Sequence, residues 1–381
     1  MMVASRGPGV GRGQGGEGRV SFMNLLILGD GPEERAWAAT IARGAEHTLS
    51  AAYPGFAGLD DVARPRDLDD ALVVAGIDAV VVGGAPGFRA EALRRVAAEG
   101  LLAVCLHPPG PDSEAYYQVA LSRAETGAVL VPDLSLRLHP GVERLRQAMA
   151  GQELGAFRGL RYEAIVDPAS GDLARFHFAR AVDVVRSLLG EIEAVTATGD
   201  PPGDQPDEML VVQLRASDAR RAEVRLSSGP VAPPQLVLTG ANGSLTLELP
   251  DNLTDTDLEC WDPHGAILDV LAAARAGRDV HPDLADGTRA MEVAEGVVRS
   301  LRRGRTVELH YEEISEAGTF KSVMTSLGCL ILLAVLVVLP IALAGPALGI
   351  GWTIYLAYLI PPLLLVFLCL QLLRFAARGS S

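Results

Sequence analysis

Short apolar runs alternate with amphipathic stretches from residue 24 to residue 132. The apolar runs are rich in small and β-branched residues and lie between turn signals, as in "GIDAVVVGGAP". Such runs are typical of strands buried on both faces of a sheet, and the stretches between them have helical spacing. The pattern therefore predicts a doubly wound parallel sheet with helices on both faces. The predicted strands are 24–28, 47–52, 79–82, 102–106 and 129–131, and the predicted helices lie near 33–43, 68–75, 89–99 and 113–126.

The pattern changes after about residue 140, where strand-like segments follow one another between a few helices. The segment "GANGS" is a hairpin turn between two of these strands. The arrangement predicts an α+β domain with a mostly antiparallel sheet. Its predicted helices are 141–150, 173–189 and 286–303, and its predicted strands are 157–165, 194–197, 210–214, 222–226, 235–238, 244–249 and 306–309.

The C-terminal part of the chain is apolar and carries no charged residue from Ser322 to Leu373. Two runs, 323–343 and 352–373, each match the ~20 residues that a helix needs to cross a bilayer. Basic residues flank both ends, which by the positive-inside rule places both ends in the cytoplasm. We therefore expect a hairpin of two transmembrane helices in a membrane, the bacterial inner membrane, with the other domains on its cytoplasmic side. A buried helical hairpin is the alternative interpretation.

Composition and charge narrow the classes of function. The chain has 381 residues and a net charge of −14, which argues against nucleic-acid binding because phosphate neutralisation needs a basic face. The four cysteines are far apart and include no C-x-x-C pair. This spacing predicts no metal site and no disulfide framework, in keeping with a reducing compartment.

A glycine turn follows the first predicted strand, in "LLILGDGPEERAW". In a Rossmann fold, Gly29 would allow the tight turn and Gly31 would let the backbone approach the pyrophosphate of a dinucleotide. Glu34 stands where the third glycine of G-x-G-x-x-G is usual, with Glu33 beside it. Two carboxylates in a first helical turn interact favourably with the helix dipole and would repel a pyrophosphate at the same N-terminus.

From residue 24 to residue 309 the chain resembles the Gfo/Idh/MocA oxidoreductases. The likeness rests on the order and spacing of "ILGDGPEERAW", "GIDAVVVGGAP", "ELGAFRGLRY", "GANGSLTLELP" and "DGTRAMEVAEGVVRSLRRGRTVEL". The resemblance implies an N-terminal Rossmann domain that binds NAD or NADP and a second α/β domain that shapes a site for sugars or polyols. It also implies association into a homo-oligomer through the open face of the second sheet.

These patterns together predict six parts of the chain. They are a Gly/Arg-rich disordered tail at 1–22, a Rossmann-like domain at 23–133, a Gfo/Idh/MocA-like α/β domain at 134–312, a linker at 313–322, the membrane hairpin at 323–373 and a cytoplasmic tail at 374–381.

The resemblance assigns candidate catalytic and cofactor residues, several of which depart from the family pattern. Tyr53 stands where an acid usually binds the ribose, and it is either an adenine-stacking ring or a surface aromatic. His107 takes the place of the lysine in Glu-Lys-Pro, as an acid–base group or as a structural histidine. Arg180 occupies the position of the general acid–base histidine and cannot release a proton at physiological pH. His177, three residues earlier, is a substitute for that base or a packed histidine.

Two further residues fall where the family lines its substrate pocket. Arg137 could bind a hydroxylated or acidic ligand, or serve the helix entry at "HPG". Asp183 is the later acid of the motif on the long helix, and its alternative role is pairing on the helix surface.

The departures affect the pyrophosphate turn, the ribose site, the lysine and the histidine base. They favour a membrane-anchored oxidoreductase-like protein with weak or lost hydride transfer, which binds a nucleotide or sugar-type ligand or docks a partner. The alternative is an active NAD(P)-dependent oxidoreductase of sugar-like or polyol substrates with His107 and His177 as its acid–base groups. A transporter is a weaker third class, because the apolar runs contain no ionisable residue.

Overall fold

A computed structural model describes residues 22–310, except 45, 57–61, 168, 170, 204 and 250–260, together with 340 and 344. The described residues up to Leu309 form one compact unit that contains two sheets.

The first sheet has five parallel strands in the order β2-β1-β3-β4-β5. An isolated parallel bridge between Ala51 and Ala63 lies beside β2, where a doubly wound dinucleotide-binding sheet has a further strand. The carboxyl ends of β1 and β3 therefore lie at the centre of one edge, where such folds bind their ligands. The strands are β1 (Met23–Leu28), β2 (His47–Tyr53), β3 (Ala79–Val82), β4 (Leu102–Leu106) and β5 (Val129–Asp133).

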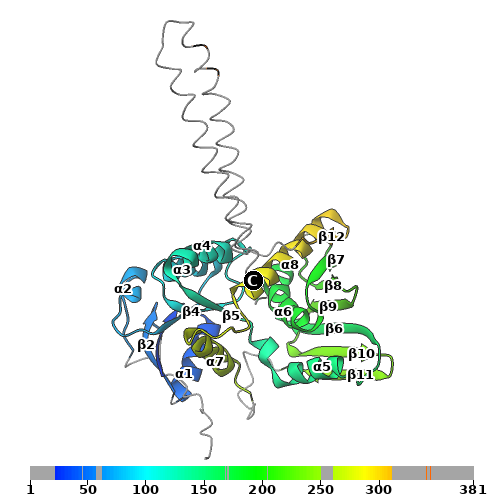
Figure 1. The fold of residues 1–381 in the computed structure, drawn as a ribbon, viewed down its shortest axis with the longest axis horizontal. Coiled ribbons are helices and arrows are strands. Elements are labelled where there is room, and N and C mark those ends of the chain that lie inside the picture. The colour runs from blue at the N-terminus through cyan, green and yellow to red at the C-terminus, as the bar shows by residue number, and fades with distance from the viewer. Residues whose placement is uncertain are drawn as a thin grey trace, which may run out of the picture. The chain divides into compact units, whose positions relative to one another are not determined.

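Helices cover both faces of the parallel sheet (Figure 1). Alternate residues of β1 point to opposite faces: Leu25 and Ile27 to one cluster, Leu26 and Leu28 to the other. Helices α1 (Pro32–Arg43) and α7 (Pro263–Arg275) pack on the first face. Helices α3 (Pro86–Ala98) and α4 (Glu114–Thr126) pack on the second, and the short α2 (Leu68–Leu72) lies beside β2.

The second sheet has seven strands in the order β11-β10-β6-β9-β8-β7-β12. The pair β6–β9 is parallel and all the other neighbours are antiparallel, so the sheet is mixed. Its strands are β6 (Phe157–Val166), β7 (Ile192–Asp200), β8 (Met209–Ala216), β9 (Arg221–Ser228), β10 (Ala232–Gly240), β11 (Gly243–Glu248) and β12 (Val307–Glu308). Its helices are α5 (Pro140–Ala150), α6 (Phe178–Leu189) and α8 (Leu284–Arg303).

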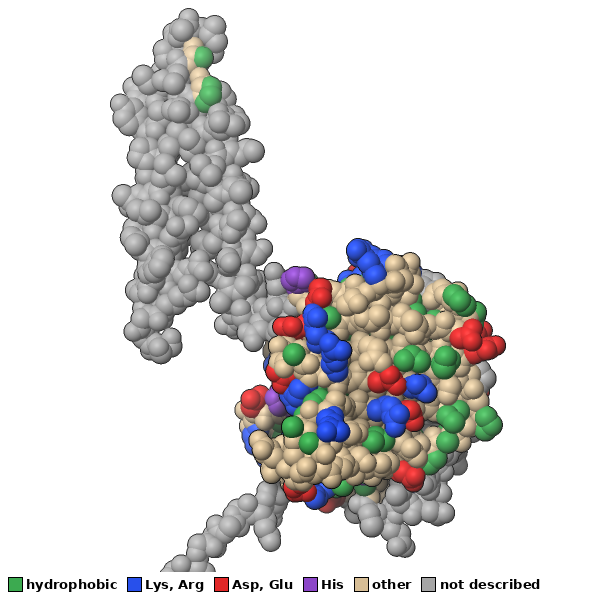
Figure 2. All heavy atoms as spheres, turned by 90° about the vertical axis from the view of Figure 1, so that its right-hand side faces the viewer, with side chains coloured by type: hydrophobic (Ala, Val, Ile, Leu, Met, Phe, Trp, Pro, Cys, Tyr) green, Lys and Arg blue, Asp and Glu red, His purple; other side chains and the backbone are tan. Residues whose placement is uncertain are grey.

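One face of the second sheet is covered by helices and the other is open. On β6, Leu160 and Tyr162 are buried towards the helices, and Arg161 and Glu163 alternate with them on the open side. Figure 2 shows this open side, where basic, acidic and hydrophobic side chains are interspersed. The homo-oligomer that the family resemblance implies would use this face, and it stays a prediction.

Helix α8 connects the two sheets. It packs on β7 of the second sheet and also reaches α4 and β5 of the first. A Cβ atom on Gly287 of α8 would lie 2.9 Å from Cε2 of Tyr116 and 3.1 Å from Cβ of Pro132. The glycine therefore permits the close approach of α8 to the first sheet.

Replacement of Gly287 by alanine is expected to lower the free energy of unfolding by about 1–3 kcal/mol, because overpacking outweighs the helix propensity that alanine gains. Denaturant unfolding of the full chain measures this. The matched control is Gly87→Ala in α3, where a Cβ would meet no atom within 4 Å. The control should be neutral or slightly stabilising. Equal destabilisation by both changes would contradict the packing explanation.

The strands of the parallel sheet confirm the sequence prediction to within two residues at each end. Helix α7 was not predicted at all, although the sequence has the local signals for it. Asp262 caps the backbone N–H of His264 and Pro263 is the first helical residue, followed by apolar positions Ile267 and Leu271. The sequence analysis assigned no element between the predicted strand 244–249 and the predicted helix 286–303.

The expected membrane location is contradicted. No helix within the described ranges combines the length and the apolar character that a bilayer crossing requires. The long helix α8, for example, is amphipathic and carries Arg and Glu residues along its exposed side. The predicted spans at 323–343 and 352–373 lie outside the described residues, apart from Pro340, as do residues 1–21, the linker and the final tail.

Candidate functional site

The candidate site is a crevice between the carboxyl edge of the parallel sheet and helices α1, α6 and α7. It encloses a cavity of about 40 Å³, which is enough for a few water molecules and far below the ~300 Å³ of a small ligand pocket. The crevice therefore has no room for a small ligand in this conformation. The cavity is lined by Glu33, Trp37, Asp133, Leu134, Ser135, Leu136, Arg180, Asp183, Val184 and His264.

The glycine turn between β1 and α1 has the expected backbone geometry. Gly29 has a φ of 120°, which glycine adopts readily, and its N–H donates to the carbonyl of Tyr53 at 2.8 Å. Gly31 is the N-cap residue of α1, and Pro32 is the first helical residue. The turn and the helix N-terminus thus have the form of an anion-binding cradle.

The side chain of Glu34 fills this cradle. The residue is only 2% exposed, and its Oε1 accepts a hydrogen bond from the N–H of Gly84 at 2.5 Å. A Cβ atom on Gly29 would lie 2.8 Å from Oε1 of Glu34, and one on Gly31 would lie 2.6 Å from Oε2. The carboxylate therefore occupies the space next to both fingerprint glycines. In this conformation the turn does not fit the pyrophosphate of a dinucleotide.

The neighbouring carboxylate of Glu33 spans the crevice. Its Oε1 lies 2.5 Å from Nη1 of Arg180, which belongs to α6. The guanidinium of Arg180 also lies over the ring of Phe176, 5.1 Å from its centroid. Burial opposes the charge of Arg180, yet the carboxylates of Glu33 and Asp133 raise its pKa above the usual value. Arg180 is therefore a fixed cation of the site.

A second group of contacting side chains in the crevice includes a histidine. The Nε1–H of Trp37 donates to Oδ2 of Asp133 at 3.1 Å, and the ring of His264 lies 4.5 Å from that of Trp37. Nδ1 of His264 is 3.0 Å from Oγ1 of Thr40, whereas its Nε2 has no hydrogen-bond partner among the described residues. Burial lowers the pKa of His264, so the ring is neutral near pH 7. Sequence reasoning missed His264 because it missed α7.

His107 lies away from this cavity and is completely buried. Its Nε2–H donates to the carbonyl of Ala179 in α6 at 3.1 Å, and its Nδ1 is 3.0 Å from the hydroxyl of Tyr116. Burial and the nearby cation of Arg180 lower the pKa of His107 to about 3. Both ring nitrogens are engaged, so the structure gives His107 a structural place between β4 and α6.

His177 and Tyr53 also lie outside the cavity lining. His177 ends a π-helical turn, and burial, followed by the charge of Arg180, lowers its pKa to about 4. Tyr53 is half-buried at the end of β2, and its ring lies 6.2 Å from that of Phe88. The adenine-stacking role of Tyr53 stays a prediction.

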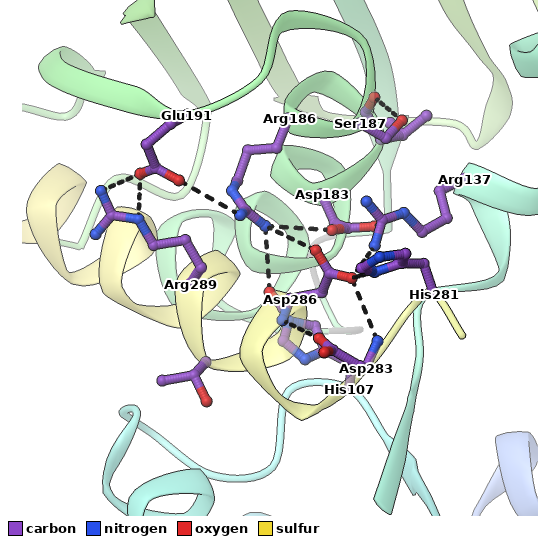
Figure 3. A network of polar contacts seen from close by, with 12 residues as sticks. His107, Arg137, Asp183, Arg186, Ser187, Glu191, His281, Asp283, Asp286 and Arg289 are labelled. Carbon is purple, nitrogen blue, oxygen red and sulfur yellow. Dashed lines mark hydrogen bonds and ion pairs between the residues drawn. The ribbon is translucent and has the colours of Figure 1, made fainter. Parts of the chain in front are cut away.

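Arg137 and Asp183, both predicted at the substrate pocket, are brought together in a buried ion-pair network (Figure 3). Nε of Arg137 lies 3.3 Å from Oδ2 of Asp183, and its Nη1 lies 2.5 Å from Oδ2 of Asp286 in α8. Nη1 of Arg186 lies 3.5 Å from Oδ1 of Asp183. The network therefore connects the Ser135–Leu138 turn to α6 and α8, and Asp183 alone of its carboxylates faces the cavity.

Burial raises the pKa of Asp183 to about 6, although both arginines act in the opposite direction. Burial also acts to raise the pKa of Asp286. The charge of Arg137 and the hydrogen bond from His281 outweigh it, so this pKa lies below its usual value. His281, Asp283 and Asp286 lie close enough for a cation, but their ligand atoms are already used. Asp283 caps the N–H of Asp286, and Asp286 pairs with Arg137.

A larger cavity, of about 290 Å³, lies in the second domain between α5, β6 and β10. Its lining is mostly apolar, and Arg220 is the one charged residue in it. This cavity has no acid–base group, so the crevice remains the candidate site.

The chain is similar to proteins that act on inositols. It is 25% identical over 327 residues to inositol 2-dehydrogenase of Rhizobium meliloti (strain 1021), a match that covers 74% of this chain and 98% of the relative. No protein-family model matches the chain.

Solved structures of dehydrogenases have a similar fold. Scyllo-inositol dehydrogenase from Lactobacillus casei, with bound NAD(H) and scyllo-inositol, matches with a TM-score of 0.63 at 19% identity, over 76% of this chain and 99% of that one. GenD2 from gentamicin A biosynthesis, in complex with NAD, matches with a TM-score of 0.65 at 19% identity, over 81% and 100%. The chain therefore has the Gfo/Idh/MocA fold in its inositol dehydrogenase-like form.

Proposed function

We propose that the chain is an NAD(P)-dependent oxidoreductase of the inositol dehydrogenase type, acting on a polyol or sugar-like substrate. The observation that carries this proposal is the match to inositol 2-dehydrogenase, which extends over 98% of that relative and 327 residues. The active-oxidoreductase alternative of the sequence analysis is thereby favoured over lost activity. Two structural neighbours contain NAD, and one of them also contains scyllo-inositol.

The crevice has the groups that recognition of a polyol requires. Hydroxyl groups both donate and accept hydrogen bonds, and the cavity offers the acceptor oxygens of Asp133 and the donor nitrogens of Arg180. A polyol can enter only when the crevice widens, because the present cavity holds a few waters. The ion pair between Glu33 and Arg180 spans the crevice and would have to part or shift with it.

His264 is the group best placed to take a proton from a substrate hydroxyl. It lines the cavity, it is neutral near pH 7 because burial lowers its pKa, and its Nε2 is uncommitted among the described residues. When Nδ1–H donates to Thr40, Nε2 carries the lone pair that accepts the proton. His107 has no free nitrogen for this role.

The test uses the full chain with NAD or NADP and a panel of inositols, including myo-inositol and scyllo-inositol. We expect absorbance of the reduced nicotinamide to rise with at least one polyol and one of the two cofactors. A matched variant, Arg180→Ala, should raise KM for the polyol if the guanidinium contacts it. Absence of cofactor reduction across the panel, with the protein folded, would contradict the proposal.

A second candidate function is binding of a polyol without hydride transfer. The observation that favours it is the Glu34 side chain in the glycine turn, which closes the dinucleotide cradle. Calorimetry separates the two functions. A polyol that binds to the chain while neither cofactor is reduced would support this second candidate.

A further inference from the structure

The position of Glu34 sets it apart from the other acidic residues near the crevice. It is the residue at the third glycine position of the fingerprint, and it is 2% exposed. Glu33, directly before it, points to Arg180 instead and is partly exposed. The two adjacent carboxylates therefore have different tasks, and only Glu34 enters the cradle.

The partner of the Glu34 carboxylate is backbone, at the place where the fold binds phosphate. Its Oε1 accepts from the N–H of Gly84, which follows β3, and the carboxylate lies against Gly29 and Gly83. Within the described residues, no Lys or Arg forms an ion pair with it. The carboxylate therefore stands beside the first turn of α1, where a phosphate would be held, while its own hydrogen bond comes from the loop between β3 and α3.

We propose that Glu34 is an internal competitor of the dinucleotide, whose carboxylate occupies the pyrophosphate position and sets the affinity of the site for NAD(P). The carboxylate and a pyrophosphate exclude each other for two reasons. They need the same volume beside Gly29 and Gly31, and they carry charge of the same sign. A dinucleotide therefore binds only after the Glu34 side chain has left the turn, and this step weakens binding. The inference rests on the proposed function, since it concerns the cofactor site of that reaction.

Binding of NADH to the full chain tests the inference, measured by calorimetry or by nicotinamide fluorescence. Glu34→Gly restores G-x-G-x-x-G, and we expect its dissociation constant to fall by roughly 10- to 100-fold, which corresponds to about 1.4–2.7 kcal/mol. Glu34→Ala should give a similar fall without adding a helical glycine. Glu34→Gln keeps the volume and removes the charge, and we expect an intermediate value.

The matched control is Ala39→Gly, an exposed position of the same helix, and it should bind NADH as the wild type does. Thermal unfolding of each variant verifies that it is folded. Affinities of Glu34→Gly and Glu34→Ala equal to that of the wild type would overturn the inference. Because the readout is binding, it is independent of turnover. Tighter binding by the variants without cofactor reduction would leave the inference standing and count against the proposed function.

Discussion

Replacement of His264 by asparagine is expected to lower kcat for polyol oxidation by about 10²- to 10⁴-fold, the range that loss of a general acid–base group costs. Asparagine can keep a hydrogen bond to Thr40, which now contacts Nδ1, but it cannot take up a proton. Binding of the cofactor and of the polyol should change little. Steady-state kinetics together with calorimetry separate these effects.

The pH profile adds a second readout for His264. Burial lowers its pKa below the usual 6.5, so the neutral, proton-accepting form is lost only in the acid range. In the wild type, kcat/KM should therefore rise with pH through a pKa below 6.5, and the asparagine variant should lack this limb. His177→Asn is the comparison, since His177 does not line the cavity, and its activity should stay near that of the wild type. Equal kcat values for His264→Asn and wild type would show that another group carries the proton.

Replacement of Arg137 by alanine is expected to lower the free energy of unfolding by about 3–5 kcal/mol at neutral pH, because it removes a buried partner of two carboxylates. Arg137 is 12% exposed and pairs with both Asp183 and Asp286. Without Arg137, the negative charges of these two buried carboxylates are neutralised, among the described arginines, only by Arg186 and repel each other more strongly. Denaturant unfolding at several pH values measures the effect.

The destabilisation by Arg137→Ala should become smaller as the pH falls. This direction follows from the protonation of Asp183. Its pKa is about 6 in the folded protein against the usual 3.8 of an aspartate, so the folded state holds this proton more tightly than the unfolded state. A raised carboxyl pKa contributes stability at low pH that is lost as the pH rises through about 6. Because Arg137 lowers the pKa of Asp183, its removal raises that pKa further. The cost of the variant should therefore be larger at pH 8 than at pH 5.

The control for this prediction is Arg144→Ala, which removes an ion pair with Glu153 on the surface. Both side chains are about half exposed, so this pair is screened by water and its loss should change stability little at either pH. A cost of Arg137→Ala that is the same at pH 5 and pH 8 would contradict the assigned role of Asp183.

The parallel sheet could be predicted from the sequence because its strands are short apolar runs between clear turn signals. The glycine turn was predictable for the same reason, and the sequence also indicated that carboxylates stand near it. It could not indicate which of the two enters the turn. That depends on Arg180, which is distant in sequence and pairs with Glu33, and on Gly84, which offers an N–H to Glu34.

The histidines show where reasoning by position was insufficient. His107 was aligned with a catalytic lysine, but its shorter side chain ends in contacts with Tyr116 and the carbonyl of Ala179. His264 comes from a helix far along the chain, and its place beside Trp37 results from the packing of α7 on the first sheet. Such long-range packing is not encoded in local spacing. The pairing of Arg137 with Asp183 is similar, since both were predicted at the pocket and the structure joins them to each other.

The packing of α7 also has a consequence for the order in which the chain can fold. Ile267, Leu268 and Leu271 complete the apolar cluster on the α1 face of the parallel sheet, although the last strand of that sheet ends at Asp133. During synthesis from the N-terminus, the five strands leave the ribosome long before the helix that covers them. Until then, part of this face stays open to water. Maturation of the first sheet therefore waits for almost the whole second domain to emerge, and His264 reaches the crevice in the same late step.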